Sequence, residues 1–114
     1  MTNWDALVAH AKATADRPIL DLFAKGDRAA DFSVTADGML FDYAKTGIDA
    51  KARDLLLALA EGAGLAARRR AMFEGAKINE TEGRAVLHVA LRAGDEAVIR
   101  VDGADVLPEV RATR

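Results

Sequence analysis

The chain has 114 residues, of which 51% are hydrophobic and 30% charged, and its formal net charge is -2. This length suits one domain with a modest core, and the charge gives no electrostatic reason to expect nucleic acid or an anionic membrane as a partner. The absence of cysteine excludes disulfides, thiolate metal ligands and a cysteine nucleophile, and it is compatible with a cytoplasmic location. The N-terminus lacks a basic segment followed by an apolar one, and the apolar runs are far shorter than the ~20 residues that span a bilayer, so neither a signal peptide nor a membrane helix is expected.

Two short helices are predicted at the start of the chain. Apolar residues at helical spacing from Trp4 to Ala15 indicate the first, with Thr2 or Asn3 as its N-cap. Pro18 fits the first turn of the second, which carries apolar residues on one face and ends near Gly26.

The pattern then changes to a period of two around the pair Asp37-Gly38, which supplies the positive backbone dihedrals that a two-residue hairpin turn needs. The predicted register pairs three residues with three others on one apolar face: Phe32 with Tyr43, Val34 with Phe41, and Ala36 with Met39. A lone hairpin is marginally stable in water, so we expect this face to rest on helices.

A longer helix is predicted after Asp49, a good N-cap, and its buried stripe consists of Ala52, Leu55, Leu56 and Leu59. Gly62 and Gly64 separate it from a further helix, which ends at Gly75. Three residues of this helix are expected to face inward: Leu65, Met72 and Phe73.

The next segment combines a capping pattern with an apolar run. Asn79 and Glu82 are spaced as a capping box, with Thr81 as a rival cap. Between Ala85 and Leu91 only His88 is not apolar, which predicts a helix buried on nearly all sides.

A second Asp-Gly pair, Asp102-Gly103, predicts a second hairpin that joins residues 98–101 to residues 104–106, and Pro108 is expected to begin a final helix. A helix of one or two turns has few hydrogen bonds to offset its nucleation cost, so we expect Arg114 to interrupt a longer chain. The fold class expected is α+β, with about five helices and two small β-hairpins, in a single domain or fragment over residues 1–114.

The histidines are the first candidates for chemistry, because imidazole titrates near neutral pH. Within an apolar helix, His88 is expected to be buried, neutral and hydrogen-bonded, and not to bind metal. His10 is expected to face solvent on the first helix. Two isolated histidines make a poor zinc site, so no metal site is expected.

The other polar candidates have structural explanations. Glu80 and Glu82 are conceivable bases beside His88, but Glu82 is better explained as the partner in the capping box. Arg68–Arg70 project over about 200° of a helix, so they predict a solvated face and not a phosphate site. Ser33 is the only serine and is not placed with a histidine and an acid, and the glycines form no nucleotide-binding pattern.

The run Lys77–Arg92 resembles the N-terminal signature of the glucose-6-phosphate isomerase family, Asn-x-Thr-Glu-x-Arg-Ala-Val-Leu-His-x-Ala-Leu-Arg. Two flanking segments, Leu40–Lys45 and Val101–Val110, look like the same family in its order. The resemblance implies interconversion of glucose 6-phosphate and fructose 6-phosphate through a cis-enediol, without metal or organic cofactor. It also implies a glutamate base, with histidine and lysine for ring opening. These groups and the phosphate loops belong to α/β sugar-isomerase domains expected after Arg114.

From this resemblance, we expect no catalytic, cofactor-binding or metal-binding residue within 1–114. Arg84 and Arg92 match the family's arginines and are expected to make ion pairs or cap carbonyls at the junction with the sugar-isomerase domains. Glu80 departs from the family pattern and is expected at the surface.

The partners implied are the sugar phosphate for the full-length enzyme, the missing sugar-isomerase domains and further copies in a homo-oligomer. Nucleic acid and membranes are not expected, and the location implied is the cytoplasm. The alternative is a non-enzymatic interaction domain that binds a partner through the face left bare by those domains. The buried-looking helix from Ala85 to Leu91 supports this alternative, since a short chain does not fully cover it.

Overall fold

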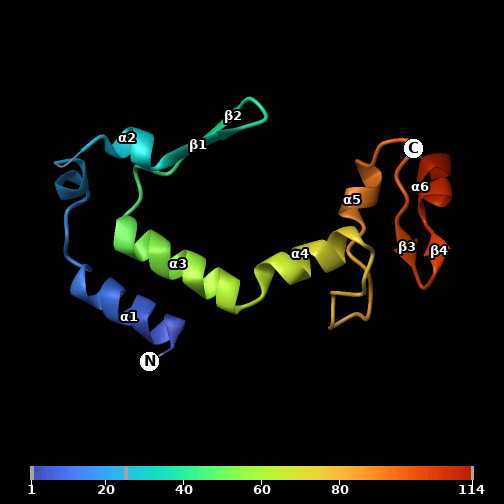
Figure 1. Cartoon of the computed structure of the whole chain (residues 1–114), viewed down its shortest axis with the longest axis horizontal. Helices are drawn as coiled ribbons and strands as arrows, with labels where there is room; N and C mark the ends of the chain where they lie inside the picture. The colour runs from blue at the N-terminus through green and yellow to red at the C-terminus, as the bar shows by residue number, and fades with distance from the viewer. Residues whose placement is uncertain (1, 25, 114) are drawn as a thin grey trace. The chain divides into compact units, whose positions relative to one another are not determined.

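A computed structural model describes residues 2–24 and 26–113, and the chain divides into two compact units, Met1–Gly62 and Ala63–Arg114. The described residues form six α-helices, one 3-10 helix and two antiparallel β-hairpins, as labelled in Figure 1. The predicted α+β class with two hairpins is therefore confirmed. No helix among these residues has the length and apolar character needed to cross a membrane.

The first unit begins with helix α1, Asn3–Ala13, and the choice between two caps is decided in favour of Thr2. The Thr2 hydroxyl accepts a hydrogen bond from the Asp5 amide at 3.1 Å, and the Asp5 carboxylate accepts one from the Thr2 amide at 2.9 Å. This reciprocal pair is a capping box. The second predicted helix is a 3-10 helix, η1, over Ile19–Phe23.

The first unit also contains a short helix that the sequence did not indicate, α2, Arg28–Asp31. Asp27 caps it by accepting a hydrogen bond from the Ala30 amide at 3.2 Å. The helix has only four residues, too few to show a period of apolar positions, and this explains why the pattern was missed.

The first hairpin pairs β1, Ser33–Ala36, with β2, Met39–Asp42, in the predicted register. Asp37 and Gly38 have φ of 50° and 74°, the left-handed values that a type I′ turn requires. The Tyr43 amide donates to the Phe32 carbonyl at 2.9 Å, so the predicted facing of these two residues is also confirmed.

The expectation that the whole apolar face of this hairpin rests on helices is wrong. Phe32, at the base, is buried, but Val34, Phe41 and Met39 are 54%, 64% and 71% exposed. Figure 1 shows the turn of the hairpin projecting away from the helices of its unit, in agreement with the exposure of these three side chains.

Helix α3, Ala50–Gly62, packs beside α1. Asp49 caps it as predicted, because the Ala52 amide donates to Asp49 Oδ1 at 2.7 Å. Asn3 ties the two helices together by donating from its side-chain amide to the Ala58 carbonyl at 2.9 Å. Of the predicted stripe, Leu56 is exposed, while the other three are half-buried: Ala52, Leu55 and Leu59.

The second unit begins with α4, Leu65–Phe73, which is mostly solvated. Leu65 and Phe73 were expected to face inward, but they are 58% and 55% exposed, and only Met72 of the predicted set is half-buried. The reason is that α4 meets the rest of its unit at its C-terminal end. There Gly75, with φ of 83°, lies so close to the Arg100 carbonyl that an added Cβ would collide with it.

The core of this unit lies between α5, His88–Leu91, the hairpin of β3, Arg100–Val101, with β4, Ala104–Asp105, and the helix α6, Leu107–Thr113. Its buried residues are Ala90, Ile99 and Leu107. Asp102 and Gly103 have φ of 50° and 83°, so the second Asp-Gly turn is confirmed. The predicted helix over residues 85–91 is wrong in extent, because only its last four residues are helical.

Candidate functional site

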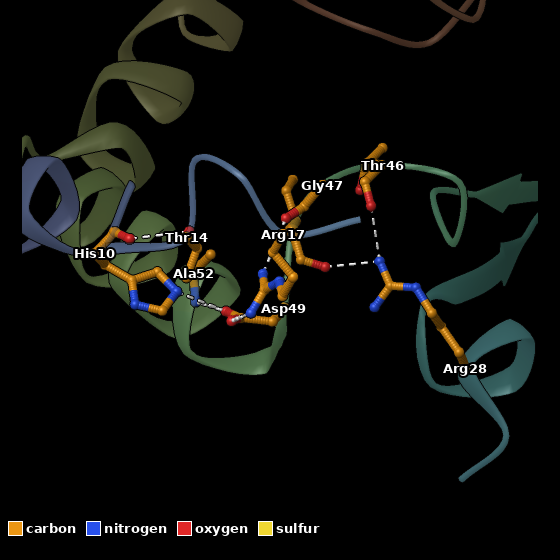
Figure 2. A network of polar contacts seen from close by, with 9 residues as sticks. His10, Thr14, Arg17, Arg28, Thr46, Gly47, Asp49 and Ala52 are labelled. Atoms are coloured by element: carbon orange, nitrogen blue, oxygen red, sulfur yellow. Dashed lines mark hydrogen bonds and ion pairs between the residues drawn. The ribbon is translucent and has the colours of Figure 1, made fainter. Parts of the chain in front are cut away.

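The densest polar network in the first unit converges on the carboxylate of Asp49 (Figure 2). Oδ1 accepts a hydrogen bond from the Ala52 amide. It also lies 2.9 Å from His10 Nε2, and the N–H group at that position donates to Oδ1. Oδ2 accepts from Arg17 Nη1 at 2.6 Å. One carboxylate therefore joins α1, the segment after it and the start of α3.

The electrostatics of Asp49 indicate an anchor and not a base. Partial burial alone raises the pKa of this carboxyl, but hydrogen bonds from the Ala52 amide, Arg17 and His10 outweigh burial and hold its pKa far below the usual range. A carboxylate that is always ionised and whose oxygen atoms are occupied has little capacity to take a proton from a substrate.

His10 was expected to face solvent, and this expectation is wrong. Its side chain is only 11% exposed because it reaches Asp49. The Thr14 hydroxyl also donates to the His10 carbonyl at 2.9 Å. The partner lies on a different element, far along the chain, so no local pattern in the sequence reveals the contact.

Arg28 forms a second polar centre in the first unit, and no sequence pattern pointed to it. It is 5% exposed and donates from Nε to the Ala44 carbonyl at 2.8 Å. Its Nη2 donates to the carbonyls of Thr46 and Ile48 at 2.9 and 2.7 Å. The Cζ atom also lies 4.1 Å from the centroid of the Phe32 ring, a cation–π distance. The loop that leads from β2 to Asp49 is thus fixed by a buried guanidinium.

In the second unit, His88 is exposed, so the prediction that it is buried is wrong. The residues before it are not helical, and His88 instead opens the short helix α5, whose inward residue is Ala90. His88 borders a cavity of about 520 Å³, the His88 hollow, lined by Phe73, His88, Val89, Arg92, Ala93, Ala97, Val98 and Ile99.

No helix begins at Asn79, so the capping-box interpretation is also wrong. The backbones of Asn79 and Arg84 pair through two hydrogen bonds of 3.1 and 3.2 Å, which close a tight loop. Asn79 Oδ1 accepts from the Thr81 hydroxyl at 2.8 Å and from the Glu82 amide at 3.3 Å. The same side-chain chemistry that caps a helix here builds a turn.

The remaining candidates lie at the surface. Glu80 is exposed, as expected, and pairs with Arg68 at 2.6 Å, while Arg69 and Arg70 are solvated. Arg84 and Arg92 are exposed and have no ion-pair partner within residues 2–24 and 26–113.

The last candidates for a chemical role are Ser33 and a metal site. The Ser33 hydroxyl donates to the Ala30 carbonyl at 3.4 Å. In the part of the chain that the structure describes, no three residues among His, Cys, Asp and Glu gather closely enough to hold a metal ion.

Comparison with known proteins gives consistent results. A model of the family described as phosphoglucose isomerase matches residues 42–114. Among curated relatives, the glucose-6-phosphate isomerase of Cereibacter sphaeroides (strain KD131) is 61% identical over 110 residues, or 96% of this chain. Proteins of the same name from Jannaschia sp. (strain CCS1) and Frankia casuarinae are 55% and 48% identical over 97% and 95% of this chain.

In each of these relatives the match covers 20% of the protein, so the chain spans about a fifth of their length. The family model covers more than half of the chain and includes the His88 hollow and the loop around Asn79. The chain therefore belongs to the phosphoglucose isomerase family.

Proposed function

We propose that this chain is the N-terminal part of a glucose-6-phosphate isomerase, which interconverts glucose 6-phosphate and fructose 6-phosphate in the cytoplasm. The observation that carries the proposal is the 61% identity over 110 residues to a relative of that name. The enzyme acts in glycolysis and gluconeogenesis, binds its sugar phosphate without a cofactor and assembles as a homo-oligomer.

Within that enzyme, residues 1–114 serve as one structural N-terminal region and supply no catalytic residue. Aldose–ketose isomerisation needs a base beside C1 and C2, a group that opens the ring and donors that hold the phosphate. The carboxylate of Asp49 already accepts hydrogen bonds from His10, Arg17 and the Ala52 amide. No carboxylate lines the His88 hollow. The first observation supports a structural role for the Asp49 network, and the second leaves the His88 hollow without a carboxylate base.

The test compares the isolated chain with a hybrid enzyme in which it replaces the matching 110 residues of the Cereibacter sphaeroides relative. Fructose 6-phosphate isomerisation is followed in a coupled dehydrogenase assay. We expect turnover by the hybrid and none above background by residues 1–114 alone. Turnover by the isolated chain that disappears in His88→Ala would contradict the structural role, and a folded but inactive hybrid would contradict the proposed enzyme.

A further inference from the structure

The His88 hollow is apolar at its floor and walls, yet open to solvent. Ile99 belongs to the buried core of the second unit, while Phe73 and Val98 at the border are 55% and 58% exposed. The apolar side chains around this cavity of about 520 Å³ have no packing partner on its open side, so they lack dispersion contacts there. Their apolar surface is also exposed to water. This geometry fits an apolar side chain supplied from outside the unit.

The polar side chains at the border of the hollow set a second requirement for the group that fills it. Arg92 and His88 are the polar side chains that line the hollow, and no carboxylate lines it. Arg92 is exposed and forms no ion pair with any residue in the described ranges. A guanidinium matches a carboxylate in planar, bidentate geometry, so the complementary occupant carries an acid next to its apolar group.

We propose that the His88 hollow is the docking site for the remaining four-fifths of the family's polypeptide chain. That part places an apolar side chain in the hollow and a carboxylate against Arg92. The assignment rests on the proposed function. It is favoured over a second copy of this chain because the relatives are five times as long as the matched segment, and the family match includes every residue of the hollow.

The first experiment locates the occupant in the hybrid enzyme described above. A photo-cross-linking benzoylphenylalanine replaces Val98 in one variant and Arg69, an exposed residue of α4 outside the hollow, in a control. After irradiation, peptide mass spectrometry should find the Val98 position joined to residues of the same chain beyond the matched fifth, with at least tenfold lower yield from position 69.

The outcomes separate this proposal from the proposed function. An active hybrid whose position 98 forms no cross-link, or one only to a second subunit, overturns the docking site and leaves the enzyme assignment standing. An inactive but folded hybrid with the expected cross-link supports docking and contradicts the enzyme assignment.

The second experiment tests the carboxylate through charge reversal in two contexts. Arg92→Glu should lower the melting temperature of the hybrid by several degrees more than that of the isolated chain, because only the hybrid contains the partner carboxylate. Arg92→Lys, which keeps the charge, should recover part of the loss, and Arg70→Glu should shift both proteins equally. An equal shift of both proteins by Arg92→Glu overturns the proposed ion pair.

Discussion

Replacing Asp49 with alanine should remove the contact that joins α1 to the start of α3. The substitution deletes an N-cap, which contributes about 1 kcal/mol, and a partly buried hydrogen bond to the charged Arg17, which contributes about 1.5–3 kcal/mol. It also leaves His10 without its acceptor. Since these groups share one carboxylate their effects are not additive, and we expect a total loss of about 2–4 kcal/mol.

The assay is urea unfolding followed by the fluorescence of Trp4, the only tryptophan, which lies on α1 and therefore reports on the first unit. Far-UV circular dichroism of the same samples reports on the helices of both units. Asp54→Ala, an exposed acid on the same helix, is the matched control and should change the free energy of unfolding by less than about 0.5 kcal/mol. A loss of less than about 0.5 kcal/mol in Asp49→Ala would refute the anchoring role.

Three further predictions concern the ionisation of Asp49, the close approach at Gly75 and the exposure of His88. Because the pKa of Asp49 is lowered in the folded state, its stabilising effect is present above about pH 4 and is lost as the pH falls below that value. The difference in unfolding free energy between the native chain and Asp49→Asn should therefore shrink in acid, and a constant difference between pH 7 and pH 3 would contradict this. Gly75→Ala should destabilise the chain by more than Gly83→Ala in thermal melts. Both glycines have positive φ, but only the Cβ at position 75 meets a backbone carbonyl, that of Arg100, so equal losses would argue against the close approach. His88→Ala in the isolated chain should alter stability by less than about 0.5 kcal/mol, because the side chain is exposed; a loss of about 2 kcal/mol would instead indicate burial.

The sequence predicted best those features that depend on neighbouring residues. The turns at Asp37-Gly38 and Asp102-Gly103 need positive φ at two successive positions, and this local demand fixed both hairpins and the register of the first. The cap at Asp49 followed from its position before an apolar helical pattern. The family signature was likewise read from contiguous residues, and the family match confirms it.

The features that depend on distant residues were missed or misread. His10 and Arg28 bind atoms on elements that no periodicity connects to them, so their burial was not predicted. The apolar run before Leu91 indicated a buried helix, but its first three residues are half-buried in an irregular segment and only the last four are helical. Asn79 was misread because caps and turns use the same short polar side chains.

The position of Arg28 has a consequence for how the loop after β2 tolerates change. Its guanidinium contacts main-chain oxygen atoms at alternate residues, and main-chain oxygen atoms are common to all residues. Ala44 is constrained because it is buried, but the side chain of Lys45 is exposed. Position 45 is therefore suited to carrying a fluorophore or an affinity group on a loop of fixed path. A lysine in place of Arg28 would offer only one nitrogen atom, and the loop would lose the planar fork that shapes it.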